Sequence, residues 1–134
     1  SEDTLLFEKW MQLCSKKETS VLMSFADDLS MRGKEKVKNF LLHSISILRE
    51  CNTKKYIPEY RMKTPKTEGE FRSKFSDFLG YQCTQDLYES LNNSVYNIER
   101  NANLKIELFQ LSLTLRDSLK RQNRRRKVAQ SQDI

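Results

Sequence analysis

The sequence is poor in the residues that break helices and form tight turns. Its 134 residues include three glycines and two prolines, too few for the many turns of an all-β domain. It also lacks any apolar run near the roughly 20 residues that span a bilayer, and no signal-peptide pattern opens it. These absences favour an all-α fold and predict no contact with a membrane.

Residues that bind metals or form disulfides are scarce as well. The chain has one histidine, His43, and three widely spaced cysteines, Cys14, Cys51 and Cys83. One histidine with scattered cysteines cannot supply a zinc pattern, and no C-x-x-C pair is present. An odd number of cysteines in helical sequence argues against a disulfide framework, so we expect a reducing, cytoplasmic compartment.

Catalytic patterns are missing too. No G-x-x-x-x-G-K-[ST] loop is present to cradle a nucleotide phosphate. The carboxylate pairs Asp27/Asp28 and Glu68/Glu70 are typical of helix surfaces and first turns. His43 has no Cys, Asp or Glu four residues away, which favours a hydrogen-bonded or exposed side chain over a ligand. We therefore expect no catalytic site, no metal, no cofactor and no small-molecule ligand in this chain.

What the sequence does contain is apolar periodicity of the helical kind. A first helix is predicted from about residue 3 to 14. A capping box at residues 15–18 (SKKE) predicts a second helix from there to Arg32, with Gly33 as its left-handed closing residue. The third is predicted over about 34–51, where the repeat is clearest, at Val37, Phe40, Leu41, Ser44, Ile45 and Leu48.

Residues 52–66 contain both prolines and are predicted to be the one long connection, dividing the bundle into two three-helix halves. A functional loop is possible there, but we favour a solvated crossover. A second capping box at 67–70 (TEGE) opens a fourth helix, which ends at Gly80. The fifth helix is predicted to begin after Thr84 and to end near Asn101.

The last predicted helix begins near Asn103 and has an unusually wide apolar surface. Such a surface indicates burial against several neighbours, as in a central helix. Its apolar positions are Leu104, Leu108, Leu111, Leu115 and Leu119, broadened by Ile106, Phe109 and Leu113. The expected architecture is an all-α bundle of about six helices over residues 1–122, followed by a basic tail, 123–134, that is frayed or disordered.

The positive charge is concentrated near the C-terminus. The chain carries a net +6, of which residues 120–134 contribute +5. This run could contact nucleic-acid phosphates, or it could be a frayed helix end whose cations suit the helix dipole. We favour the second, since no aromatic residue interleaves the run to stack on bases. The candidate nucleic-acid contacts are Lys120, Arg121, Arg124, Arg125, Arg126 and Lys127.

The turn before the last helix is the most specific local feature. Asn101 is predicted to be the left-handed cap of the preceding helix and Asn103 the N-cap of the next. Lys105 would then face the positive end of the helix dipole, which is unfavourable. It either extends into solvent or pairs with an acidic group on another chain. Together with Phe109, these residues form the candidate subunit interface.

Four segments, in order and spacing, resemble the C-terminal region of the delta-prime subunit of the bacterial DNA polymerase III clamp loader, in a divergent form. They are residues 7–14 (FEKWMQLC), 32–41 (RGKEKVKNFL), 74–79 (KFSDFL) and 98–106 (IERNANLKI). The resemblance spans most of residues 5–121. This chain departs from the family where Ala102 replaces a frequent glycine and Gln110 a frequent acid, which affects the expected turn geometry and any polar interface contact.

The resemblance implies a collar domain, which packs with the collar domains of the other clamp-loader subunits into a ring. It implies that this chain is a piece of a longer subunit that carries an AAA+ module, and a start at Ser1 without methionine agrees with that expectation. The partners would be the other loader subunits, and the basic tail could meet DNA. The alternatives are a stand-alone nucleic-acid-binding helical module or a small bundle that regulates another protein.

Overall fold

The structure is a computed structural model that describes residues 1–16, 18–60 and 66–132, except for the side chains of residues 66–69. The described part contains six α-helices and no strand, which confirms the predicted all-α bundle. The helices are α1 (Glu2–Cys14), α2 (Thr19–Ser30), α3 (Lys34–Tyr56), α4 (Lys66–Phe78), α5 (Tyr81–Glu99) and α6 (Leu104–Gln132). Within these residues no helix has both the length and the apolar character needed to cross a bilayer.

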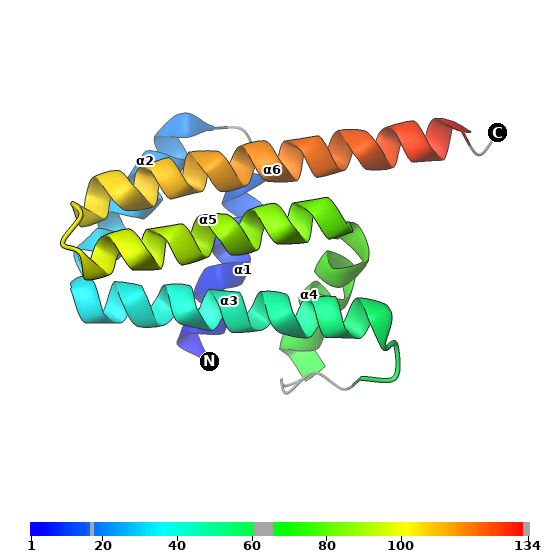
Figure 1. The fold of residues 1–134 in the computed structure, drawn as a ribbon, viewed down its shortest axis with the longest axis horizontal. Coiled ribbons are helices and arrows are strands. Elements are labelled where there is room, and N and C mark those ends of the chain that lie inside the picture. Colours follow the sequence, from blue (N-terminus) through cyan, green and yellow to red (C-terminus); the bar gives the residue numbers. More distant parts are fainter. Residues whose placement is uncertain (17, 61–65, 133–134) are drawn as a thin grey trace.

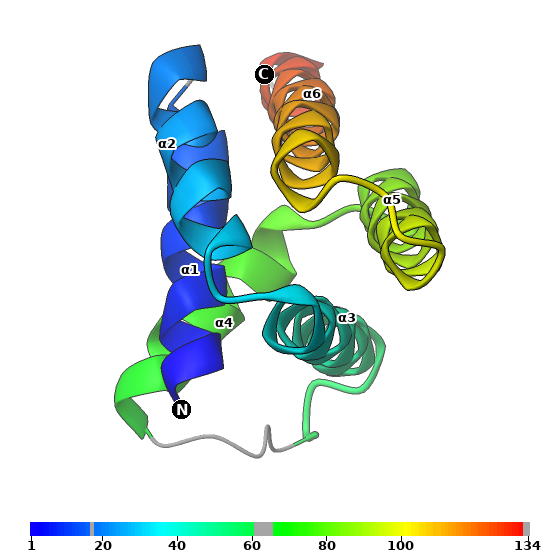
Figure 2. The same ribbon diagram turned by 90° about the vertical axis from the view of Figure 1, so that its left-hand side faces the viewer.

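The helices form two layers. The three longest, α3, α5 and α6, run along the long axis of the molecule, and α5 packs between the other two (Figure 1). Seen end-on, this layer has α1, α2 and α4 packed on one side, with α1 and α2 running across it (Figure 2). The predicted division into two three-helix halves is wrong. Helix α6 packs extensively on α2, and α3 on α5, so contacts cross the central connection.

Trp10 is the centre of the core. Its side chain is 0% exposed, and its indole lies 5.9 Å from the ring of Phe25 on α2 and 5.5 Å from that of Phe40 on α3. The indole Nε1–H donates to Ser112 Oγ on α6 at 2.9 Å. A buried indole needs such a partner, because an unpaired N–H inside the core would be unfavourable. One side chain therefore connects α1 with three other helices.

The predicted capping box at residues 15–18 is wrong. Ser15 instead ends α1, and its Oγ donates to the carbonyl oxygen of Met11 at 2.9 Å. Helix α2 begins later, at Thr19, and its N-cap residue Glu18 makes no side-chain capping bond. Lys17 lies outside the described residues. A serine can bond backward to its own helix as readily as forward to the next, so the S-x-x-E pattern was ambiguous.

The other boundaries differ by a few residues. Helix α3 continues to Tyr56, five residues beyond the predicted end, which shortens the connection. Residues 61–65, which include Pro65, lie outside the described part. Helix α4 begins at Lys66, so Thr67 is inside the helix and is not its N-cap. Helix α5 begins at Tyr81, before the predicted start after Thr84. Gly33 has a positive φ, +92°, as predicted, but its ψ of 163° is not that of a left-handed helix-closing residue, and it is the N-cap of α3, while α2 ends at Ser30 with Met31 as its C-cap.

The three cysteines are free and buried. Burial raises the pKa of the Cys14 and Cys51 thiols from 9.0 to about 12, and that of Cys83 to about 11. Since the thiolate is the reactive form, both burial and the raised pKa make these thiols poor nucleophiles. Above pH 9 the thiols ionise in the unfolded chain but remain protonated in the native one. The free energy of unfolding therefore falls as the pH rises.

We expect all three thiols to resist a disulfide reagent such as DTNB in the native protein and to react rapidly in denaturant. The measurement is the release of thionitrobenzoate with time at mildly alkaline pH, with and without urea. Fast reaction of one thiol in the native state would show that its helix opens locally. We also expect the free energy of unfolding to fall above pH 9, because burial keeps the native thiols protonated there while the unfolded thiols ionise.

Candidate functional site

The turn between α5 and α6 has the predicted caps. Asn101 has φ +66°, the left-handed conformation, and its Oδ1 accepts a hydrogen bond from Lys34 Nζ at 3.1 Å. Asn103 Oδ1 accepts from the backbone N–H of Ile106 at 3.0 Å, as expected of an N-cap. Both asparagines thus satisfy polar groups of their own chain, and Asn101 links this turn to the start of α3.

Lys105 has an acidic partner within the chain. Its Nζ lies 3.6 Å from Asp27 Oδ1 on α2, and both side chains are about half exposed. This pairing offsets the unfavourable position of a cation in the first turn of α6. Phe109 is half-buried against the core, whereas Ile106, predicted to broaden the apolar stripe, is exposed. The assignment of Asn101, Asn103, Lys105 and Phe109 to a subunit interface stays a prediction.

Replacing Asn103 with alanine is expected to lower the free energy of unfolding of the chain by about 1 kcal/mol, through loss of the cap. Asn103→Ser, which keeps a capping oxygen, should recover most of that loss. Urea titrations followed by circular dichroism would measure both. Unchanged stability in Asn103→Ala would contradict a capping role and leave subunit contact as the reason for this residue.

The basic residues of α6 divide into two groups. Arg121 pairs with Asp86 on α5 at 3.7 Å, and Arg126 Nη1 donates to the Asp77 carbonyl at 2.7 Å. By contrast, three of the basic residues make no hydrogen bond or ion pair within the described part of the chain. These are Arg124, Arg125 and Lys127, in the C-terminal part of α6, a helix whose end extends past the other helices (Figure 1). Lys120 belongs to neither group and lines a hollow with Ser15 of α1 and Phe78 of α4.

Residues 123–132 are helical, although the sequence predicted a frayed or disordered tail. Contacts with the end of α4 explain the difference. Gln122 is buried and its Nε2 donates to the Phe78 carbonyl at 2.8 Å. The Arg126 guanidinium lies 5.5 Å from the Phe78 ring. The cation over the aromatic face and the two hydrogen bonds to carbonyls at the end of α4 are favourable. Together they hold the first turns of residues 123–132, which we call the α6 extension.

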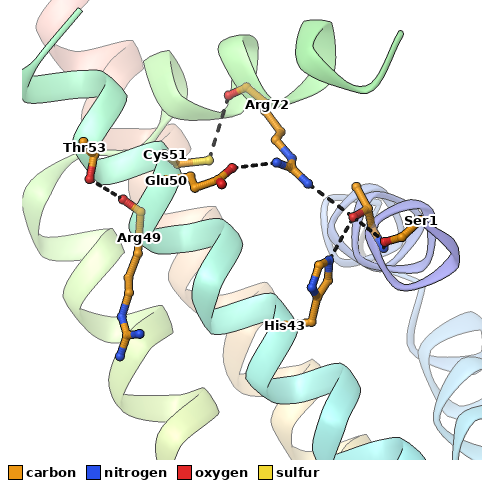
Figure 3. A network of polar contacts seen from close by, with 8 residues as sticks. Ser1, His43, Arg49, Glu50, Cys51, Thr53 and Arg72 are labelled. Atoms are coloured by element: carbon orange, nitrogen blue, oxygen red, sulfur yellow. Dashed lines mark hydrogen bonds and ion pairs between the residues drawn. The ribbon is translucent and has the colours of Figure 1, made fainter. Parts of the chain in front are cut away.

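A buried polar network joins α1, α3 and α4 (Figure 3). Arg72 is 3% exposed. Its Nη1 donates to Glu50 Oε2 at 2.7 Å, and its Nη2 donates to Thr4 Oγ1 at 3.2 Å. Cys51 Sγ lies 4.0 Å from the Arg72 carbonyl, and Ser76 Oγ donates to the Cys51 carbonyl at 2.6 Å. No sequence pattern predicted this network. The sequence contained one sign of it: Arg72 lies three residues before Phe75, on the side of the helix that faces the core.

His43 belongs to the same network. Its Nε2 lies 2.8 Å from Thr4 Oγ1, which also lies 2.9 Å from Ser1 Oγ (Figure 3). This agrees with the expectation of a hydrogen-bonded histidine. A hydroxyl beside an imidazole resembles a nucleophile and its base. However, Thr4 is 2% exposed and its oxygen already accepts from Arg72, so no substrate can reach it. We assign the network to fixing three helices against one another.

Metal ligands do not gather anywhere in the described residues: no three His, Cys, Asp or Glu side chains are placed to hold an ion. No protein-family model, curated protein or solved structure matches this chain. The case for a function is therefore made from the residues and their geometry.

Proposed function

We propose that this chain is the collar domain of a delta-prime-like clamp-loader subunit, an oligomerisation scaffold in DNA replication. The observation that carries the proposal is the pairing of the four segments that resemble the family. Segments far apart in the sequence come together in two places in the fold. Each pair of segments forms one packing contact. These contacts give a common physical reason for the order and spacing of the four segments.

The first pair is 32–41 with 98–106. Lys34 and Asn101 are joined by the 3.1 Å hydrogen bond described above, so the α2–α3 and α5–α6 turns lie together at one end of the bundle (Figure 1). Asp27 and Lys105 add an ion pair beside them. The turn that was most distinctive in the sequence is thus anchored on the second segment of the resemblance.

The second pair is 7–14 with 74–79. The rings of Phe7 and Phe75 meet edge to face at 6.0 Å. Met11 of α1 and Phe78 of α4 line the same surface hollow. The first and third segments of the resemblance therefore pack against each other.

Large apolar side chains are exposed, as expected of a scaffold that buries them against partners, although singly scattered ones also occur on monomers. Met31, at the α2–α3 turn, is 81% exposed. Others are spread over the helices and their connections: Leu5, Met23, Leu42, Tyr56, Ile57, Tyr81, Tyr96, Ile106 and Val128.

Co-purification tests the proposal. The tagged protein would be isolated from the cells that make it, and its partners identified by mass spectrometry. We expect clamp-loader subunits in stoichiometric amounts, retained at a salt concentration that removes nucleic acid. Recovery of the protein without any of these subunits would contradict the collar assignment.

A second function, nucleic-acid binding through the α6 extension, is favoured by one observation. Arg124, Arg125 and Lys127 have no partner in the described residues and lie on a helix that projects beyond the bundle (Figure 1). Cations presented in this way can replace the counterions of a phosphate backbone.

For this second function we expect the triple variant Arg124→Ala/Arg125→Ala/Lys127→Ala to lose most binding to an oligo-dT probe. The log–log salt slope should fall by about 2, for three lost phosphate contacts on a single strand. A control with the same change in charge, Lys9→Ala/Lys36→Ala/Lys55→Ala, should bind like the unchanged chain. Equal losses in both variants, or no binding at low salt, would rule out a specific role for the extension.

A further inference from the structure

The surface between α1 and α4 contains an apolar hollow of about 260 Å³. Its floor is formed by Met11 and by three phenylalanines in series. Phe71 stacks on Phe75 with ring centroids 5.6 Å apart, and Phe75 on Phe78 at 6.4 Å. Phe75 is 8% exposed, while Phe71 and Phe78 are half-buried.

A second hollow, of about 190 Å³, extends this one toward α6. The two share Ser15 and Phe78, and the second reaches Leu119 and Lys120 on α6. They therefore form one groove, from α4 across the end of α1 to the middle of α6. We call it the α1–α4 groove.

The rim of the groove is positively charged. Lys74 and Lys120 line it, and the Arg126 guanidinium lies over Phe78. Among the described residues that line the two hollows there is no acid. Glu70 pairs with Lys74 at 3.4 Å and offsets part of its charge, but both side chains are exposed and the pair is weak, so a carboxylate of a ligand can replace Glu70. An apolar floor with a basic rim complements a ligand that is apolar at its centre and acidic at its edges.

We propose that the α1–α4 groove binds a short amphipathic segment of a partner protein, with large apolar side chains on Phe71 and Phe78 and carboxylates against Lys74, Lys120 and Arg126. A helix that inserts its apolar face into a hydrophobic groove is a common mode of peptide recognition. Charge complementarity selects the acidic partner and speeds its association. This inference is independent of the collar assignment.

Single-stranded nucleic acid suits this groove less well than a peptide. Base stacking needs an open ring face, whereas Phe75 lies between the rings of Phe71 and Phe78, and the Arg126 guanidinium lies over Phe78. An apolar side chain can pack against the edges of these rings and needs no open face.

The test begins with selection of a displayed library of random peptides, about 16 residues long, on the whole chain. We expect selected peptides to combine large apolar residues at helical spacing with Asp or Glu. The best peptide, labelled with fluorescein, is then titrated by fluorescence anisotropy. Phe78→Ala should weaken its binding at least about tenfold, while Met31→Ala, which removes an exposed side chain elsewhere, should leave binding unchanged.

Because Phe78→Ala could disturb the fold, a second variant changes only the rim. We expect the selected acidic peptide to bind Lys74→Glu/Lys120→Glu at least about tenfold more weakly than the unchanged chain. A peptide in which Lys replaces each Asp and Glu should bind this variant more tightly than it binds the unchanged chain. Amide shifts in ¹⁵N spectra should change at Gln12, Ser15 and Asn123, which line the groove. A selection without acidic peptides, binding insensitive to both variants, or shifts at these residues with oligo-dT alone would overturn the proposal.

Discussion

Replacing Trp10 with alanine is expected to lower the free energy of unfolding by about 3–5 kcal/mol, the range for truncating a large buried aromatic residue. The indole contacts rings on α2 and α3 and donates to Ser112 on α6. Its loss leaves a cavity where four helices meet and a buried hydroxyl without its donor. Since domains are stable by only about 5–15 kcal/mol, the variant should be near the limit of folding.

Urea titrations followed by circular dichroism would measure this effect. Ser112→Ala keeps the indole but leaves its N–H unpaired, and it also removes the bond from Ser112 Oγ to the Leu108 carbonyl oxygen. For this variant we expect a loss of about 1–3 kcal/mol. Leu5→Ala on the same helix is the control, because Leu5 is exposed and its truncation should change stability by less than about 0.5 kcal/mol. Similar stabilities for Trp10→Ala and Leu5→Ala would contradict the packing described here.

Replacing Arg72 with methionine is expected to cost about 3–5 kcal/mol, as for one partner of a buried ion pair. Arg72 Nη1 and Glu50 Oε2 are 2.7 Å apart and the guanidinium is almost fully buried. The substitution leaves Glu50 without its cation and removes the hydrogen bond from Arg72 to Thr4 Oγ1. The double variant Arg72→Met/Glu50→Gln should lose less stability than the sum of the single variants, because it removes both charges.

The measurement is a double-mutant cycle in urea, with an expected coupling energy of about 0.5–3 kcal/mol. Lys74→Met on the same helix is the matched control: its ion pair with Glu70 is exposed, so the change in stability should stay within about 0.5 kcal/mol. Additive effects of Arg72→Met and Glu50→Gln would show that the two side chains do not interact as described.

Local patterns predicted the helices and several of their ends. Val37, Phe40, Leu41 and Leu48 repeat at helical spacing, and all four are buried. The two asparagines of the α5–α6 turn have their predicted conformations and bonds, because such caps depend on nearby backbone groups alone. A local pattern was not always enough: the S-x-x-E pattern at residues 15–18 failed because Ser15 bonds back to Met11 in its own helix.

The contacts that the sequence did not predict join distant residues. The partner of Lys105, Asp27, lies 78 positions earlier in the sequence, and no periodicity shows that the two side chains meet. The same holds for Arg72 with Thr4, and for Arg126 with the end of α4, which holds part of the extension that was predicted to fray. The α1–α4 groove was missed because its parts come from three helices whose packing no local pattern specifies.

Reconstitution from purified components tests the proposed scaffold most directly. This chain would be mixed with the other clamp-loader subunits of the same organism and the products weighed by native mass spectrometry. We predict an assembly in which this chain is present with the other subunits at a fixed ratio and remains bound during gel filtration. If the chain stays at its own mass of 15.9 kDa while the other subunits assemble without it, the collar assignment is contradicted.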